Sequence, residues 1–363
     1  MKSKKAVIAL SGGVDSAVSA LLLKKAGFDL TAVFLKNFDI KSWLTENNKN
    51  EKFTDSCSDL ADQKMAERVA NFLDIPFYVL NFEKEYAKNV FSKFIKGYEK
   101  GITPNPDVWC NTFIKFGALL KFVEKISPNA YLATGHYARL RRANLKFQIS
   151  NLAKYFYLLR GVDPSKDQAY FLWQLGQKQL EKVIFPIGGM MKTEVREIAK
   201  KNRLPNATKK DSQGICFVGK LPLKEFLKMM IKPKIGDVVL SNNTKVGEHD
   251  GAFYYTIGER ISASEVQSSK FKVHNKFQNS KLLSDSRKAL YVIYKDIENN
   301  KLVVDFDETQ ISEISNFKIQ SPNKFQNPKF KIQLNETVRA ITPGQHVVFY
   351  RGDEVLGGAI ISN

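Results

Sequence analysis

The stretch that most constrains the fold is AVIALSGGVDSAVSALLLKKAG, residues 6–27. Its apolar run at 6–10 is typical of a strand buried on both faces, and the pattern from Ala17 to Lys25 predicts a helix that ends at Gly27. A short loop of small residues joins the two. Free backbone N–H groups and the positive end of the helix dipole meet at such a junction, so the loop favours an anion.

The composition of this loop indicates which anion. Gly12 and Gly13 let the backbone approach a ligand closely, and the hydroxyls of Ser11 and Ser16 add donors. A serine-capped helix after a glycine turn is the structural alternative, but it leaves Asp15 unexplained. The loop lacks the lysine of the G-x-x-x-x-G-K-[ST] pattern. It resembles the S-G-G-x-D-S loop of the ATP pyrophosphatase (PP-loop) superfamily, which binds ATP phosphates and adenylates a substrate oxygen.

Strand and helix signals alternate along the first 140 residues. Apolar runs predict strands at 30–35, 77–82 and 130–138, and amphipathic helices lie between them. This alternation predicts a parallel sheet with right-handed crossovers. Ligands of such sheets bind at the carboxyl ends of the strands, where the loops 11–16 and 105–110 and the pair Gly135-His136 fall.

The pattern changes after residue 145. We expect a hairpin of 146–150 with 155–161, then helices near 170–183 and 193–203. From Lys234 onward short strands dominate, including 237–241, 253–258, 290–306, 329–334, 337–341 and 346–361, as in a small barrel.

These patterns predict an α/β fold with three domains. The resemblance of its loop implies that the first, at 1–212, is an N-terminal parallel-sheet PP-loop domain of the adenine nucleotide alpha hydrolase type. A small central adaptor domain follows at 213–285, and a C-terminal β-barrel completes the chain at 286–363.

Charge and composition narrow the class of protein. The formal net charge of +19 attracts polyanions such as nucleic acid, although a lysine-rich proteome would explain the same excess. No apolar run approaches the ~20 residues of a membrane span, and no signal-peptide cleavage site follows the start, so we predict a cytoplasmic protein without membrane attachment. Three cysteines are too few for a disulfide scaffold, and any that matters should act through its chemistry.

Two polar segments contain cysteines that are suited to such chemistry. In TPNPDVWCN we expect a helix to start at Asn111, which places Cys110 at a helix N-terminus, a position that favours thiolate. Asp107 is placed to carry a proton or to recognise a base edge. A buried cysteine with a turn aspartate is the alternative.

The second segment is KKDSQGICFVGK. Lys209 and Lys210 are close in sequence to Cys216 and would stabilise an anion there. We expect Cys57 to be structural. The pair Cys110 and Cys216, joined to an ATP loop, predicts thiol chemistry on an activated substrate.

Motifs along nearly the whole chain resemble those of the bacterial tRNA-uridine 2-sulfurtransferases (tRNA-specific 2-thiouridylases). They are LSGGVDS, FLKNF, TPNPDVWCN with IKFG, ATGHYAR, KDQAYFLW, KKDSQGICFVG, GEHDGAFYYTIGER, YVIYKDIENNKLVV and TPGQHVVFYRGDEVLGGAII. The resemblance implies ATP-dependent 2-thiolation of the wobble uridine in the tRNA anticodon loop, with release of AMP and PPi.

The resemblance also implies site residues. ATP would be held by Ala9, Leu10, Ser11, Gly12, Gly13, Val14, Asp15, Ser16, Leu35 and Gly135. The target base would meet Asn105, Pro106 and Asp107, and tRNA would meet His136, Lys166, Asp167, Gln168, Gln345 and the C-terminal barrel.

The sulfur chemistry follows from the same family. Cys216 would carry a persulfide received from a sulfur-donor protein, either a cysteine desulfurase or a sulfur relay. Cys110 would be the partner thiol, leaving a transient Cys110–Cys216 disulfide, and Asp107 the proton carrier. We expect Mg²⁺ to come with ATP, with no protein-held metal and no permanent cofactor.

Other interpretations remain open. His136 would otherwise be a core histidine, Lys166–Gln168 a solvated loop and Gln345 a turn residue. The chain departs from the family at Glu259, usually glutamine, and in a short 317–333 stretch where Lys324, Lys329 and Lys331 replace a basic-aromatic segment. The alternative functions are another PP-loop enzyme (an amidotransferase-type ligase or a tRNA-lysidine-forming enzyme) and an inactive tRNA-binding protein.

Overall fold

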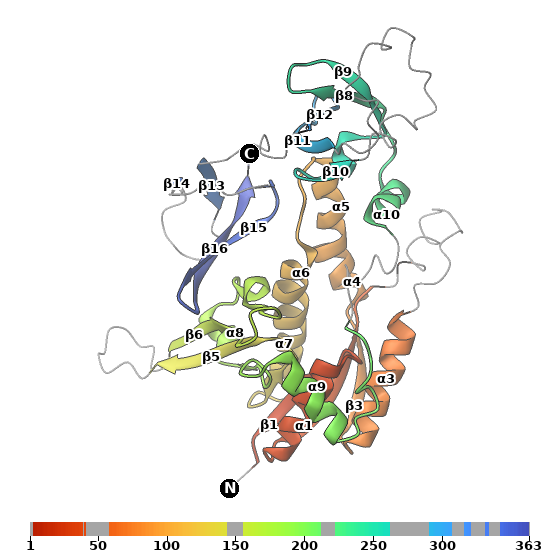
Figure 1. The fold of residues 1–363 in the computed structure, drawn as a ribbon. Coiled ribbons are helices and arrows are strands. Elements are labelled where there is room, and N and C mark those ends of the chain that lie inside the picture. Colours follow the sequence, from red (N-terminus) through yellow and green to blue (C-terminus); the bar gives the residue numbers. More distant parts are fainter. Residues whose placement is uncertain are drawn as a thin grey trace. The chain divides into compact units, whose positions relative to one another are not determined.

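A computed structural model describes residues 3–38, 40, 58–143, 155–211, 222–261, 290–306, 316–320, 331–333 and 342–362. Cys57, Cys216 and the strands expected at 146–150 and 337–341 lie outside these residues. The chain divides into two compact units (Figure 1). Unit 1 comprises Met1–Phe91, Pro106–Lys220 and Val348–Gly358, and unit 2 comprises Ser92–Asn105, Leu221–Val347 and Ala359–Asn363.

Unit 1 begins with alternating strands and helices, as the sequence predicts. The elements are β1 (Lys5–Ala9), α1 (Val14–Lys25), β2 (Asp29–Lys36), α3 (Ser58–Phe72), β3 (Phe77–Asn81), α4 (Glu83–Tyr86), the π-helix η1 (Ala87–Phe91), α6 (Pro106–Trp109), the π-helix η2 (Cys110–Leu119), α7 (Leu120–Ile126) and β4 (Tyr131–Ala133). The unit continues with β5 (Ala138–Ala143), β6 (Tyr155–Arg160), the 3₁₀-helix η3 (Ala169–Leu172), α8 (Gln177–Leu180), β7 (Val183–Ile184) and α9 (Lys192–Lys201).

Five of these strands form one parallel sheet, in the order β3-β2-β1-β4-β7. The predicted parallel sheet is therefore confirmed. Strand order reverses between β1 and β4, because β2 and β3 follow on one side of β1 while β4 and β7 lie on the other. Ligands of open parallel sheets bind at such a reversal, beyond the carboxyl ends of the strands.

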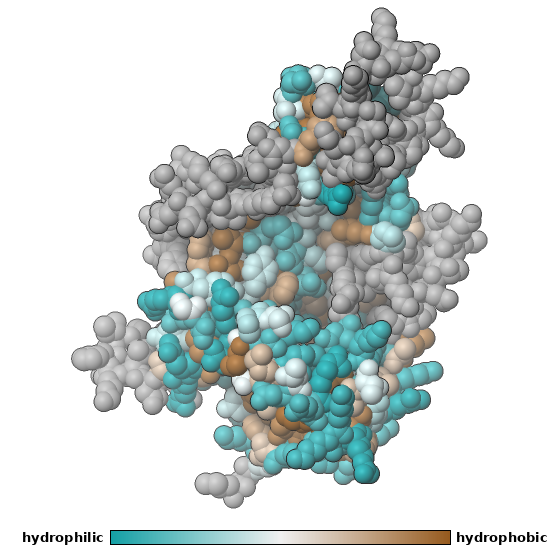
Figure 2. Space-filling view, viewed as in Figure 1, coloured by the Kyte–Doolittle hydropathy of each residue, from teal (hydrophilic) through white to brown (hydrophobic). Residues whose placement is uncertain are grey.

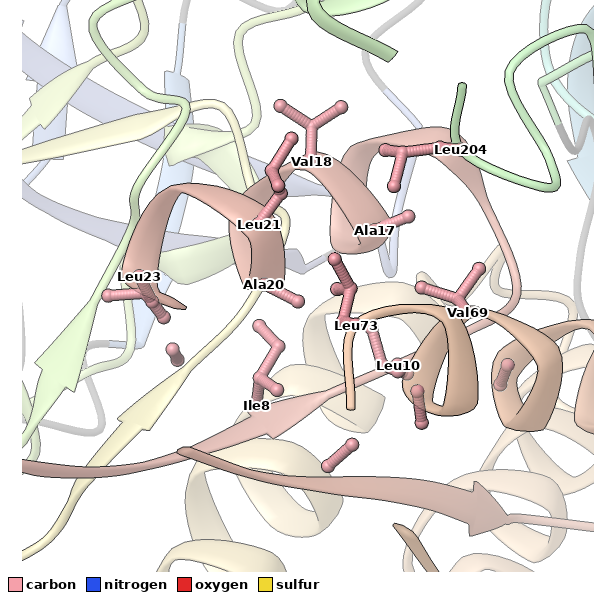
Figure 3. Packing of buried hydrophobic residues seen from close by; sticks show 14 of the residues in the cluster. Ile8, Leu10, Ala17, Val18, Ala20, Leu21, Leu23, Val69, Leu73 and Leu204 are labelled. Carbon is pink, nitrogen blue, oxygen red and sulfur yellow. The ribbon is translucent and has the colours of Figure 1, made fainter. Parts of the chain in front are cut away.

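The main core of unit 1 lies between this sheet and the helices α1, α3 and α9. Alternate residues of β1 face it, and Figure 3 shows Ile8 and Leu10 directed toward Ala20 of α1 and Leu73 of α3. All four are at most 5% exposed. Figure 2 shows that the outer face of this part of the unit is mostly hydrophilic, so α1, α3 and α9 are anchored by one apolar side each.

Three local expectations for unit 1 are wrong. The partner of β6 in its hairpin is Ala138–Ala143, so the strand expected over 130–138 is split between β4 and β5 by the loop Thr134–Tyr137. The region 170–183, expected to be helical, holds the short η3 and α8 and the first residue of the strand β7. The helix expected to start at Asn111 starts at Pro106, because proline without an N–H fits the first helical position.

Unit 2 contains α5 (Ser92–Glu99), α10 (Leu223–Met230), β8 (Gly236–Leu240), β9 (Lys245–His249), the 3₁₀-helix η4 (Ala252–Tyr254), β10 (Arg260–Ile261), β11 (Leu290–Asp296), β12 (Lys301–Asp305), β13 (Asn316–Gln320) and β14 (Lys331–Gln333). Strands β15 (His346–Arg351) and β16 (Glu354–Ser362) contribute residues to both units.

A five-stranded sheet in the order β10-β11-β12-β8-β9 forms most of unit 2. It joins strands on both sides of the predicted boundary at 285/286, since β12 pairs with β8. Residues 253 and 254 of the expected strand 253–258 belong to η4 instead. Tyr254 and the adjoining Tyr255 are buried, and Tyr254 donates to the Ile231 carbonyl. In the part of the chain that the structure describes, no helix is long and apolar enough to cross a membrane.

Gly135, which follows β4, provides a test of this fold. A Cβ at Gly135 would lie 2.7 Å from the Ser16 nitrogen and 2.8 Å from the Asp15 carbonyl carbon, both of them backbone atoms in the first turns of α1. We expect Gly135→Ala to lower the free energy of unfolding by about 1–3 kcal/mol, because backbone on both sides has to move. The midpoint of urea unfolding measures the change.

Gly189→Ala is the matched control, because a Cβ there meets nothing within 4 Å. It should leave stability unchanged or raise it by roughly 0.4–1 kcal/mol through the unfolded chain. Equal midpoints for the two variants would contradict the close approach of Gly135 to α1.

Candidate functional site

The predicted ATP residues gather at the strand-order reversal of unit 1. Ala9 ends β1 and is followed by the loop to α1, Leu35 is the penultimate residue of β2, and Gly135 follows β4. Because β2, β1 and β4 are neighbours in the parallel sheet, these positions share one edge of it. Leu35 is partly buried there beside Leu80, its register partner on β3.

The loop after β1 is closed by its own serines. The Ser16 hydroxyl donates to the Gly13 carbonyl at 3.0 Å and accepts from the Ser11 nitrogen at 3.2 Å. The Ser11 hydroxyl accepts from the Gly13 nitrogen at 3.3 Å. Both hydroxyls that we predicted as phosphate donors therefore also fix the turn, and Gly12 completes it with a φ of +75°.

The Gly12 carbonyl is held from outside the loop. Asn206 Nδ2 donates to it at 3.0 Å and Lys209 Nζ at 3.2 Å. Lys209 also pairs with Asp62 of α3. We expected Lys209 to act near Cys216, which lies outside the described residues. The structure shows that its ammonium group contacts the loop.

Asp15 lies in a network of ion pairs. Lys192 Nζ lies 2.7 and 2.8 Å from its two carboxylate oxygens, and the Tyr137 hydroxyl donates to one of them at 2.9 Å. Lys192 also lies 2.8 Å from Asp211, to which Arg196 donates at 2.6 Å.

Asp211 is a second centre of this network. Lys166 donates to its other oxygen at 3.0 Å. Burial raises the pKa of Asp211, but hydrogen bonds from Lys192 and Lys166 outweigh it and bring the pKa to about 2. Burial and the charge of Asp15 raise the pKa of Tyr137, which keeps its phenol protonated as a donor.

Our sequence reasoning missed Lys192, although a signal was present. Lys192 is the first residue of α9, and a cation is unfavourable at the positive end of a helix dipole unless an anion compensates it. Its side chain is buried, which demands a partner for the charge as well. The partner, Asp15, lies 177 residues away in sequence.

The predicted tRNA contacts at 166–168 have partners within unit 1. Asp167 accepts from the nitrogens of Gly161 and Ala169, each at 3.0 Å. Gln168 accepts from the Tyr137 nitrogen and donates its own backbone N–H to the Tyr137 carbonyl. With Lys166 on Asp211, these three residues brace the loop after β4.

Asp107 and Cys110 lie on consecutive turns of one helical stretch. Asp107 is in the first turn of α6, and Cys110, which is buried, begins η2. Burial raises the pKa of Asp107, and the positive charge of Lys115 opposes part of this rise. A carboxyl with a raised pKa is suited to proton transfer.

His136 joins the two halves of the site. Its neighbour Gly135 touches the first turns of α1, while its ring lies 5.7 Å from that of Phe116 on η2 and 6.1 Å from that of Phe185. The Thr134 hydroxyl lies 2.7 Å from Nδ1. At 8% exposure His136 has the surroundings of a core histidine, and burial followed by the charge of Lys115 lowers its pKa well below the ordinary value.

The remaining predicted residues lie elsewhere. Asn105 and Gln345 belong to unit 2, where Gln345 Nε2 donates to the Thr103 carbonyl at 2.8 Å. Pro106, at the start of α6, is buried. Cys216 lies outside the described residues. Within those residues, no group of three or more His, Cys, Asp or Glu side chains is placed to hold a metal ion.

Glu259, the departure from the family pattern, has internal partners in unit 2. It accepts from the Thr256 nitrogen at 2.8 Å. Burial lowers the pKa of Lys295 to about 8, and the charge of Glu259 opposes this shift. A carboxylate at this position therefore compensates a buried lysine. Of the three lysines in the 317–333 stretch, Lys324 and Lys329 lie outside the described residues and Lys331 begins β14.

Family models match three consecutive parts of the chain. A tRNA methyl transferase HUP domain matches residues 4–220, a tRNA methyl transferase PRC-barrel domain matches 224–305, and an aminomethyltransferase beta-barrel domain matches 319–361. The HUP domain matches the parallel-sheet domain predicted from the sequence. The two barrel domains confirm the expected order of a sheet domain, a small central domain and a C-terminal barrel.

Full-length relatives carry a more specific name. The chain is 40% identical over 98% of its length to the tRNA-specific 2-thiouridylase MnmA of Geobacillus thermodenitrificans, covering 94% of that protein. The enzyme of the same name from Listeria innocua is 40% identical over 98% of this chain and 94% of its own length. The one from Staphylococcus aureus is 40% identical over 100% of this chain and 96% of its own length. Although two of the domain names refer to methyl transfer, this identity extends over the whole chain, and the chain belongs to the tRNA-specific 2-thiouridylase family of PP-loop proteins.

Proposed function

We propose that this protein catalyses ATP-dependent 2-thiolation of the wobble uridine of tRNA. The observation that carries the proposal is the continuity of residues 134–137: Gly135 abuts the anion-binding loop, and His136 packs on the helix that bears Asp107 and Cys110. An ATP site and a thiol-bearing segment therefore share the loop after β4. Family membership supplies the substrate, since the relatives are named for 2-thiouridine formation in tRNA.

In the first step the uracil O2 attacks the α-phosphorus of ATP. A bond forms between O2 and phosphorus, PPi leaves, and Asp107 takes the N3 proton, which leaves the ring of the O2-adenylate uncharged. The loop at 11–16 would hold the phosphates, with Leu35 against the adenine and Mg²⁺ arriving with ATP. Asn105 and Pro106 would help to position the base, which has to leave its stack.

In the second step a persulfide on Cys216 supplies the sulfur. Its terminal sulfur attacks C2, AMP leaves, and a C2–S–S–Cys216 adduct forms. The Cys110 thiolate then attacks the Cys216 sulfur, the S–S bond to the base breaks, and 2-thiouridine leaves with its proton restored. This leaves a Cys110–Cys216 disulfide that an external dithiol has to reduce, and a sulfur-donor protein has to restore the persulfide.

Nucleoside analysis after reaction tests this function. The purified protein is incubated with unmodified tRNA, ATP, Mg²⁺, a cysteine desulfurase, cysteine and a dithiol, and the digested tRNA is analysed by mass spectrometry. We expect 2-thiouridine with the wild type and a loss of at least about a hundred-fold with Cys216→Ser or Cys110→Ser, because a hydroxyl neither carries a persulfide nor breaks one. Cys57→Ser is the control and should keep the wild-type rate.

The outcomes separate the alternatives. Undiminished thiolation by Cys216→Ser would overturn the sulfur-transfer step. Release of AMP that depends on tRNA, without thiouridine in any reaction, would favour another PP-loop enzyme. No AMP with any tRNA would favour a tRNA-binding protein without catalysis.

The pH dependence of the reaction tests Asp107. As a base it must be ionised, so the thiolation rate should fall as pH drops through its raised pKa. Lys115→Met removes a charge that lowers this pKa, so the acid limb of the rate profile should move to higher pH. Single-turnover rates between pH 5 and 8 would show the shift.

Two further variants complete that test. Asp107→Asn should lower the rate by about a hundred-fold or more and abolish the acid limb. Lys121→Met, an exposed lysine on the adjoining α7, should leave the profile unchanged. An acid limb that stays in place in Lys115→Met would contradict the assignment of the base.

A further inference from the structure

Lys192 is a buried cation that contacts Asp15, at the start of the helix after the candidate phosphate loop. The Lys192 side chain is 10% exposed. Its ammonium group contacts three carboxylate oxygens, two on Asp15 and one on Asp211. Asp211 has two further cations, Arg196 and Lys166. Among the described groups, the only cation that contacts the Asp15 carboxylate is Lys192, and this carboxylate also accepts a hydrogen bond from the neutral phenol of Tyr137.

Asp15 creates an electrostatic problem for an ATP loop. It lies in the first turn of α1, where the dipole and free N–H groups attract phosphate, yet its own negative charge repels that ligand. A carboxylate there is compatible with phosphate binding only when a cation compensates it. The position of Lys192 meets this requirement.

We propose that Lys192 is a positioning residue for ATP binding: it neutralises Asp15 and fixes its carboxylate away from the phosphates. The inference rests on the proposed function, since it assumes that the loop binds ATP. The role is electrostatic, so it depends on the sum of the two charges more than on either side chain. Removing the cation alone should harm binding, and removing both charges should restore it.

Equilibrium binding of α,β-methylene-ATP with Mg²⁺, in the absence of tRNA, measures this directly. Lys192→Met should weaken binding by roughly ten-fold to a hundred-fold, because a bare carboxylate then lies near the phosphates in a medium of intermediate dielectric. The double variant Asp15→Asn/Lys192→Met should recover most of this loss, and Lys192→Arg should stay within about three-fold of the wild type. Lys200→Met, exposed on the same helix, is the matched control and should bind as the wild type does.

The affinity for tRNA separates this electrostatic role from a purely structural one. If the role is electrostatic, Lys192→Met should keep its affinity for unmodified tRNA in a gel-shift assay, and its KM for ATP should rise while its KM for tRNA does not. Joint loss of ATP and tRNA binding without recovery in the double variant would overturn the proposal, and so would wild-type affinity for the analogue in Lys192→Met. No recovery with Asp15→Asn would also overturn it, because the carboxylate itself would then be required, as a magnesium ligand would be.

The proposed function fails in a distinguishable way. If the wild-type protein does not bind the analogue, the ATP site itself is refuted. If the wild type binds and the four variants do not follow the pattern above, only the role of Lys192 is refuted.

Discussion

The close approach of Gly135 to the first turns of α1 sets the geometry on which the site of unit 1 depends. A Cβ would lie within 3 Å of the backbone of Asp15 and Ser16, so the chain after β4 can cross the helix N-terminus only where it has no side chain. This contact brings two loops to one point at the reversal of strand order. It also directs the next two residues to opposite sides, with His136 toward η2 and Tyr137 toward Asp15.

A second set of constraints comes from the chain after α8. The segment from Lys192 to Asp211 supplies side chains that contact the loop and the start of α1. Lys192 pairs with Asp15, and Asn206 and Lys209 donate hydrogen bonds to the Gly12 carbonyl. The Gly12 carbonyl accepts both of these hydrogen bonds from the same segment. Buried ion pairs carry a desolvation cost. It is offset here because the carboxylates of Asp15 and Asp211 each accept from at least two donors.

The residues predicted from the family pattern to contact tRNA have structural partners in this arrangement. Asp167 and Gln168 hydrogen-bond backbone groups around Gly161 and Tyr137, and His136 is packed between aromatic rings. Substitution at these positions would disturb the ATP loop through Tyr137 and Asp211 even without any contact with RNA. Loss of activity in such variants therefore does not by itself identify an RNA contact.

The sequence determined the architecture of unit 1 and the location of its anion loop. Apolar runs, helical spacing and glycines depend on neighbours a few residues apart. These local patterns predicted β1, β2, β3 and β4 of the parallel sheet and the helices α1, α3 and α9, but they missed the short edge strand β7. Motifs in order along the chain also predicted the family. Local signals failed where an isolated run was ambiguous, as at 253–258, where burial of tyrosine rings favours a 3₁₀ turn over a strand.

Only the tertiary structure decided which charges meet. Asp15 and Lys192 are 177 residues apart, and no local pattern relates them, because ion pairing depends on distance in space and on the exclusion of water. The same holds for Lys209, which is 197 residues from Gly12 in sequence and donates to its carbonyl. The sequence thus predicted an anion-binding loop after β1, and the fold determined which cation pairs with the carboxylate beside it.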